Sequence, residues 1–81
     1  MKIQDKLSFT DFYLSVTLLA LGEKLEKVEK TKNSSRAIFV FNPSPTIEKN
    51  VADFRDGKIL IEPQNLFVYY KILKGRLYDG N

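Results

Sequence analysis

Two groups of side chains in this sequence are of types that carry out chemistry in proteins: a pair of carboxylates and a row of lysines alternating with aromatic rings. The carboxylates, Asp53 and Asp56, lie three residues apart on a predicted helix, and oxygen ligands at such a spacing can hold a divalent cation. The end of a helix, here beside Gly57, is also where solvated charges gather. We therefore expect no metal site.

The chain lacks the residues that most enzymes use. Its 81 residues include neither His nor Cys, which removes the commonest general acid or base, the commonest metal ligand and the thiol nucleophile. The four glycines are isolated from one another, so no glycine-rich loop is available for a phosphate group. The sequence predicts a protein that is not an enzyme, with no cofactor, no catalytic residue and no evident small-molecule substrate.

The lysines and rings lie near the C-terminus, where residues 66–78 have the pattern of a helix. At 100° per residue, four side chains fall within a sector of roughly 60°, while a different side presents Leu66, Leu73 and Leu77 to a core. The four are Phe67, Lys71, Lys74 and Tyr78, with Arg76 close by. Rings and cations on one face suit a nucleic-acid strand or a protein partner, but lysine stems also cover rings on ordinary packed helices. The sequence leaves these three interpretations open.

Composition indicates one small globular domain spanning residues 1–81. Hydrophobic residues make up 43% of the chain and charged residues 28%, and 13 basic and 10 acidic residues give a net charge of +3. The two signs are interleaved, as in residues 23–30, whereas a nucleic-acid-binding surface is usually more one-sided.

The absence of Cys favours a cytoplasmic location. The richest apolar run, residues 12–21, is about half a membrane span, and we expect neither a signal peptide nor a membrane helix.

The first predicted helix starts near Ser8, where Ser8 and Asp11 have the spacing of a capping box, and ends at Gly22. It is apolar almost all round, so it is either central or shared with another chain. If Phe12, Val16 and Leu19 enter the core, a second apolar face remains. This face, Leu14, Leu18 and Leu21, predicts the interface of a homo-oligomer, most simply a dimer.

The remaining elements complete an α+β domain. Residues 24–31 are rich in Glu and Lys, which favours helix, but we predict a strand that forms a hairpin with the central, doubly covered strand 36–41 through a turn at residues 32–35. A second helix follows, with Ser44 as N-cap and Pro45 at its first position. The predicted order is helix, strand, strand, helix, strand (58–61), helix (opening at 62–63). It gives a three-stranded sheet packed by three helices.

Several short segments resemble an uncharacterised family of small bacterial and phage domains of unknown function. They are Thr10-Asp11-Phe12-Tyr13, Leu18-Leu19-Ala20-Leu21-Gly22 with Leu25, Phe39-Val40-Phe41 and Leu73-Lys74-Gly75-Arg76-Leu77-Tyr78. The resemblance covers about residues 8–79 and supports a strand after the glycine. It implies a fold and a phage or mobile-element context, with no activity attached.

The sequence thus leads to two hypotheses of different kinds. The first is an accessory protein that acts as a protein-interaction or self-assembling module. The alternative is an accessory protein that binds nucleic acid through the basic and aromatic face of its C-terminal helix. Salt separates the two, because phosphate contacts weaken steeply as salt rises.

Overall fold

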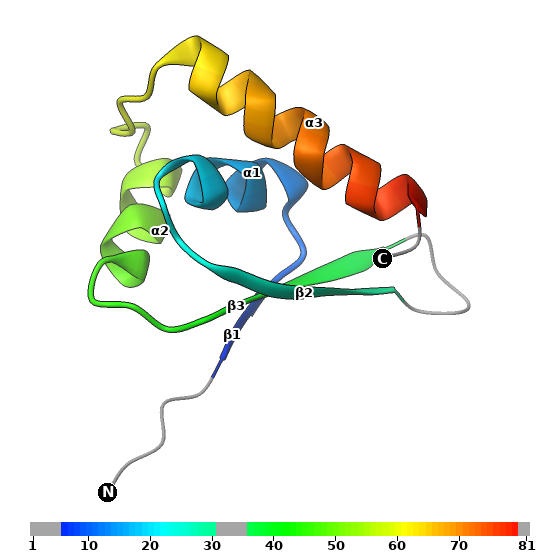
Figure 1. The fold of residues 1–81 in the computed structure, drawn as a ribbon. Coiled ribbons are helices and arrows are strands. Elements are labelled where there is room, and N and C mark those ends of the chain that lie inside the picture. Colours follow the sequence, from blue (N-terminus) through cyan, green and yellow to red (C-terminus); the bar gives the residue numbers. More distant parts are fainter. Residues whose placement is uncertain (1–5, 31–35, 80–81) are drawn as a thin grey trace, which may run out of the picture.

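We describe the protein from a computed structural model, which describes residues 6–30 and 36–79. Its elements are β1 (Leu7–Phe9), α1 (Phe12–Ala20), β2 (Leu25–Lys30), β3 (Ala37–Phe41), α2 (Ile47–Arg55) and α3 (Pro63–Asp79) (Figure 1). The predicted α+β class, with three helices and a three-stranded sheet, is confirmed. The predicted turn at residues 32–35 lies outside the described residues. No helix within the described ranges is long and apolar enough to cross a membrane.

The sheet is antiparallel, with the strand order β1-β3-β2. The predicted hairpin strands are present, and β3 is the central strand as expected. Phe39 and Phe41 of β3 are fully buried, and Val40, which must point to the opposite side of a pleated strand, is only 5% exposed. The β-branched and aromatic residues of β3 therefore behave as a buried central strand.

The third strand is not the predicted one. Residues 58–61 are extended without pairing, and Leu60 among them is 92% exposed. The strand is instead Leu7–Phe9, which pairs with β3 in the register Leu7↔Phe41 and Phe9↔Phe39. Because β1 and β2 occupy both edges of β3, no edge of the central strand is left for residues 58–61.

The first helix begins later than predicted, because Ser8 belongs to β1. The alternation of inward Leu7, outward Ser8 and inward Phe9 is the two-residue period of a strand. Asp11 is the N-cap, and its side chain accepts a hydrogen bond of 3.1 Å from the backbone N–H of Leu14. The interpretation of Asp11 as a cap is thus confirmed. Gly22 follows the helix with a φ of 99°, a value that suits glycine.

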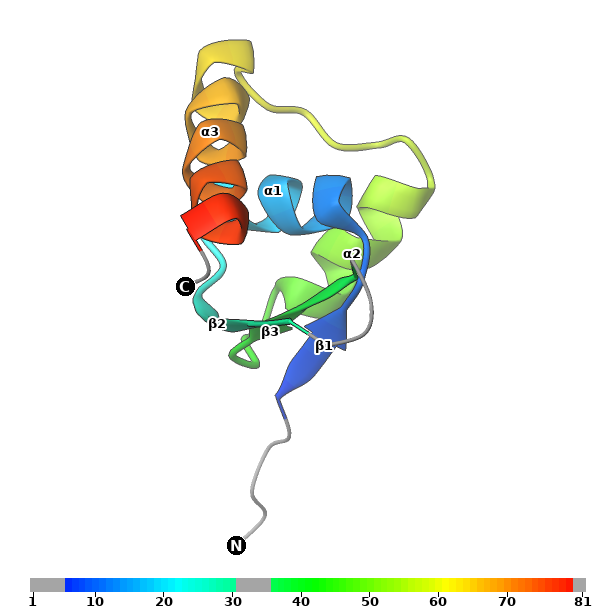
Figure 2. The same ribbon diagram turned by 90° about the vertical axis from the view of Figure 1, so that its right-hand side faces the viewer.

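All three helices lie on the same side of the sheet, and α1 is in the middle of this layer (Figures 1 and 2). It packs against α3, α2 and β1. The predicted oligomer interface is therefore wrong: Leu14 and Leu18 are buried in the core and Leu21 is half-buried. Because other elements of the same chain cover both apolar faces of α1, no apolar face of this helix is left exposed for a second chain. Helix α1 is therefore the central helix.

A buried carboxylate fixes the start of α2. Glu23 is 6% exposed and accepts hydrogen bonds from the hydroxyls of Ser44 (2.5 Å) and Thr46 (2.7 Å) and the amide of Asn50 (2.8 Å). The N-cap of α2 is Thr46, two residues after the predicted Ser44, and Ile47 is the first helical residue. Ser44 and Thr46 both use their hydroxyls to hold Glu23, which joins the end of α1 to α2.

Candidate functional site

Helix α3 is the element that carries the predicted contact residues. Its first turn is capped by Glu62, whose side chain accepts a bond of 2.9 Å from the backbone N–H of Asn65. The Asn65 amide in turn donates to the carbonyl oxygen of Ala20 at 3.0 Å, which ties α3 to the end of α1. Leu73 is fully buried, and Leu66 and Leu77 pack against the same core. The predicted core side of this helix is confirmed.

The predicted contact residues remain accessible on α3. Phe67 is 59% exposed and Tyr78 78% exposed, Lys71 is exposed, and Lys74 and Arg76 are half-buried. They do not form one uniform surface. Lys71 is exposed to solvent, whereas Lys74 lies against the rings of Tyr70 and Tyr78 on the same helix.

Lys74 lies among tyrosines. Its Nζ donates a hydrogen bond of 3.0 Å to the Tyr70 hydroxyl and lies 5.1 Å from the centre of the Tyr70 ring and 6.0 Å from that of Tyr78. The hydrogen bond to Tyr70, followed by electrostatic interactions with Tyr70, Tyr78 and Tyr13, raises the pKa of Lys74 above its ordinary value. Lys74 is therefore a cation at neutral pH. The Tyr70 ring also makes a T-shaped contact with the Phe12 ring, with 5.4 Å between the ring centres, which holds it against α1.

Sequence analysis missed two apolar residues that α3 turns outward. Val68 is 52% exposed and Ile72 is 49% exposed, and they lie four residues apart, one turn of helix. With Phe67 and Lys71 they form what we call the outer face of α3. Part of this face is a shallow depression of about 260 Å³ lined by Gln64, Phe67, Val68 and Lys71. The four-residue spacing was visible in the sequence, but apolar residues at this spacing are buried on many helices, and only the packing of α3 shows that these two are exposed.

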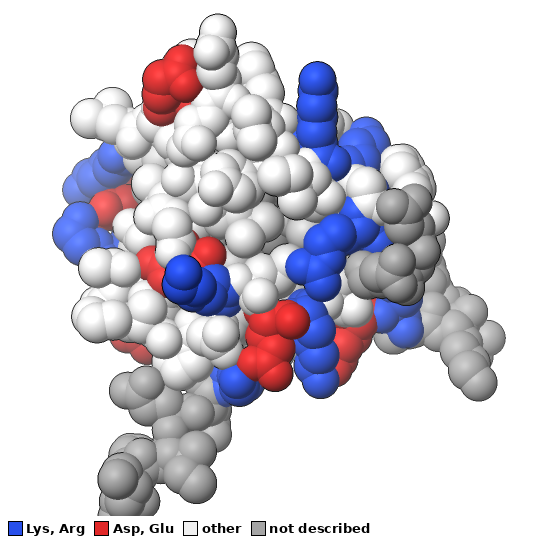
Figure 3. Space-filling model, in the orientation of Figure 1, with Lys and Arg blue, Asp and Glu red and all other residues white. Residues whose placement is uncertain are grey.

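Charges on α3 differ from those on the sheet. Lys6 pairs with Glu26 and Lys27 with Glu29 across β2 and its surroundings. Among the residues that the structure describes, no carboxylate pairs with Lys71, Lys74 or Arg76. In Figure 3 the area over α1 and the first half of α3 is largely uncharged, while basic side chains gather on the right, where α3 ends. The interleaving of charges predicted for the whole chain holds for β2 and not for α3.

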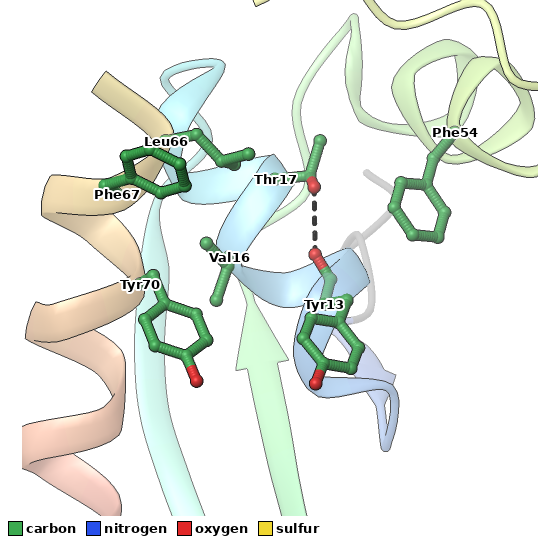
Figure 4. Close-up of a pocket in the computed structure, with 7 residues that line it drawn as sticks. All are labelled: Tyr13, Val16, Thr17, Phe54, Leu66, Phe67 and Tyr70. Carbon is green, nitrogen blue, oxygen red and sulfur yellow. Dashed lines mark hydrogen bonds between the residues drawn. The ribbon is translucent and has the colours of Figure 1, made fainter. Parts of the chain in front are cut away.

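A cavity of about 350 Å³ opens between the three helices. Its walls are Tyr13, Val16 and Thr17 of α1, Phe54 of α2 and Leu66, Phe67 and Tyr70 of α3 (Figure 4). The Thr17 hydroxyl already donates to the carbonyl oxygen of Tyr13 at 2.9 Å, and the Tyr13 and Tyr70 hydroxyls point toward the same edge of the cavity in Figure 4. We call this space the interhelical cavity. Sequence analysis did not find it, because its walls come from three separate segments.

The carboxylate pair has an ordinary explanation. Asp53 forms an ion pair of 2.7 Å with Lys49 one turn earlier on α2. Asp56 is the C-cap residue of the same helix. Within residues 6–30 and 36–79, no group of three or more His, Cys, Asp or Glu side chains is placed to hold a metal ion.

Comparisons with known proteins found no family model that matches the chain, no similar curated protein and no similar solved structure. The resemblance to small bacterial and phage domains therefore stays a prediction, and function must be argued from the chain's own surface.

Proposed function

We propose that this chain is a non-enzymatic protein-interaction module that docks an acidic segment of another protein on the outer face of α3. The observation that carries the proposal is the exposure of Phe67, Val68 and Ile72, each about half or more accessible, on successive turns of one helix. Single exposed apolar residues are normal on protein surfaces, whereas adjacent ones beside a depression are typical of interaction sites.

The charge of this face favours an acidic partner. Lys71 lies within it and Arg76 near its end, and neither meets a carboxylate in the described part of the chain. A second copy docking through the same face would bring Lys71 toward its own counterpart, and like charges in an interface oppose association. On a partner, carboxylates would pair with Lys71 and Arg76. Leucine-like side chains beside them would cover the exposed Val68 and Ile72.

Gly75 supports a close approach of the partner. It lies inside α3, where glycine costs about 1 kcal/mol relative to alanine, and a Cβ built there meets no atom within 4 Å. Packing inside the chain therefore does not require this glycine. It lies one turn after Lys71, so a partner crossing the outer face would pass close to the helix backbone there.

The test uses matched synthetic helices, one with leucines flanked by glutamates and one with the glutamates replaced by lysines. Titration into the isotope-labelled protein, followed by amide NMR shifts, should show the acidic peptide perturbing α3 and the basic peptide binding far more weakly. Val68→Glu with Ile72→Glu should abolish binding. Lys58→Glu, an equal charge change on the exposed loop before α3, is the control and should bind normally.

Two results would count against the proposal: equal binding of the acidic and basic peptides, or shifts that map away from α3. Light scattering at high micromolar concentration covers the remaining alternative, self-assembly. A dimer dispersed by the Val68→Glu and Ile72→Glu pair would make a second copy the occupant of this face. A cytoplasmic location is part of the proposal and rests on the lack of Cys in the sequence.

Nucleic-acid binding is the second candidate, favoured by Lys74, whose Nζ lies 6.0 Å from the centre of the exposed Tyr78 ring. A single-stranded oligonucleotide should then bind at low salt, and Lys71→Glu with Lys74→Glu should abolish that binding without unfolding the chain. Each lost phosphate contact should reduce the log–log salt slope by about one unit, and Tyr78→Ala should weaken binding by about 1 to 3 kcal/mol. No binding at low salt would end this candidate.

A further inference from the structure

The interhelical cavity is apolar along its walls and polar at one end. The apolar surface comes from the side chains of Val16, Phe54 and Leu66. The Thr17 hydroxyl already donates its hydrogen bond to the carbonyl oxygen of Tyr13. The polar groups at the edge are the hydroxyls of Tyr13 and Tyr70 (Figure 4). The Tyr70 hydroxyl accepts its hydrogen bond from Lys74, which brings a cation to that end.

We propose that this cavity binds a small molecule with an apolar body and a single carboxylate. The body would lie between α1, α2 and α3 against Phe54, Leu66 and Phe67. The carboxylate would meet the Lys74 ammonium group and the Tyr13 hydroxyl at the polar end. This site uses the inner flank of α3 and is separate from the proposed docking face, except that Phe67 borders both.

The size of the cavity sets the size of the ligand. At about 350 Å³ it is at the low end of small-molecule pockets, which run from roughly 300 to 1,000 Å³. A medium-chain fatty acid or an aromatic carboxylate fits that range. Larger lipids do not.

The charge at the rim selects the headgroup. Among the residues that the structure describes, Lys74 has no carboxylate partner, and like other lysines it is a cation at neutral pH. A charge-assisted hydrogen bond is about twice as strong as a neutral one. An acid should therefore bind more tightly than an alcohol with the same carbon chain.

The experiment compares octanoate with octanol as competitors of the fluorescent probe 1-anilinonaphthalene-8-sulfonate, bound to the full chain at neutral pH. Octanoate should bind about tenfold more tightly than octanol, the factor expected for one hydrogen bond to a charged group. Lys74→Met should remove that difference, and Lys71→Met, a matched loss of charge on the outer face, should preserve it.

A second variant locates the site. Phe67→Ala removes an exposed wall residue, so the chain should stay folded by circular dichroism while both competitors weaken. Equal affinity of octanoate and octanol in the parent protein would overturn the proposal. So would an unchanged preference in Lys74→Met, or binding that is insensitive to Phe67→Ala. Failure here leaves the peptide experiment on the outer face unaffected, because the two tests share no ligand.

Discussion

Helices α1 and α3 are both rich in apolar residues, yet they have opposite environments. In α1 the five consecutive residues 14–18 are all buried, whereas α3 has one fully buried apolar residue, Leu73, over 17 residues. Position in the layer explains the difference. Helix α1 has the sheet below it and another helix on each flank, while α3 is an outer helix with one side against α1 (Figure 2).

The comparison shows that an all-round apolar helix is better evidence for a central helix than for an oligomer interface. Sequence analysis treated Leu14, Leu18 and Leu21 as an apolar face left over once the other side of this helix had entered the core. In the actual fold the helices share one side of a small sheet, and Leu14, Val16 and Leu18 all find neighbours within the chain. The surplus apolar surface is on α3 instead.

The largest expected effect comes from the same substitution made on the two helices. Leu18→Lys should unfold the domain, because an unpaired buried ammonium costs several kcal/mol and an 81-residue domain has only about 4 to 12 kcal/mol of stability. Ile72→Lys should leave a folded protein, since Ile72 is about half exposed. Thermal melts followed by circular dichroism distinguish the two. A folded Leu18→Lys protein would mean that α1 is not central.

A buried and an exposed phenylalanine give a second, smaller contrast in stability. Phe39 is 2% exposed and lies 6.1 Å from the Phe12 ring of α1. Phe39→Ala should therefore cost about 3 to 5 kcal/mol. Phe67→Ala on α3 should cost much less, because its ring is largely in solvent. Urea denaturation measures the free energy of unfolding of both variants. Similar losses would contradict the assignment of Phe39 to the core and of Phe67 to the surface.

For the two carboxylates at helix ends, Glu23 and Glu62, we also expect substitution of the buried residue to cost more stability than substitution of the exposed one. Glu23→Gln places an amide N–H₂ where Glu23 accepts three hydrogen bonds in a buried position, which should cost about 1 to 3 kcal/mol. Glu62→Gln at the exposed start of α3 should cost less than about 1 kcal/mol, since an amide oxygen can still accept from Asn65. Equal costs in chemical denaturation would show that Glu23 is solvated.

Gly75→Ala should have the smallest effect on stability and the opposite sign. With no atom near the added Cβ, the variant should gain up to about 1 kcal/mol from helix propensity. The same methyl group should weaken docking of the acidic peptide if the partner crosses α3 closely. A loss of stability would show that the helix does not continue through residue 75 in solution.

Local patterns in the sequence predicted much of the fold. The β-branched run of β3, the glycines after α1 and α2, the Asp11 cap and the Leu66, Leu73 and Leu77 side of α3 are each set by neighbouring residues. Strand β1 was missed because three residues show too little alternation to be distinguished from a helix start. Residues 58–61 were assigned as a strand because their apolar run cannot reveal that β3 has no free edge.

The candidate site was only partly predictable for the same reason. Helical spacing found Phe67, Lys71, Lys74 and Tyr78, but the contact of the Tyr70 ring with Phe12 depends on α1 packing beside α3. The cavity and the exposure of Val68 and Ile72 depend on which helices are neighbours. No periodicity within one segment contains that information.

The central claim is that the outer face of α3 recognises an acidic partner, and a charge-swap titration tests it most directly. Affinities of the acidic and basic peptides are measured by NMR titration for the parent chain and for Lys71→Glu with Arg76→Glu. The account predicts that the parent prefers the acidic peptide and that the double variant, with its fold intact, prefers the basic one. An unchanged preference in the folded double variant would contradict it.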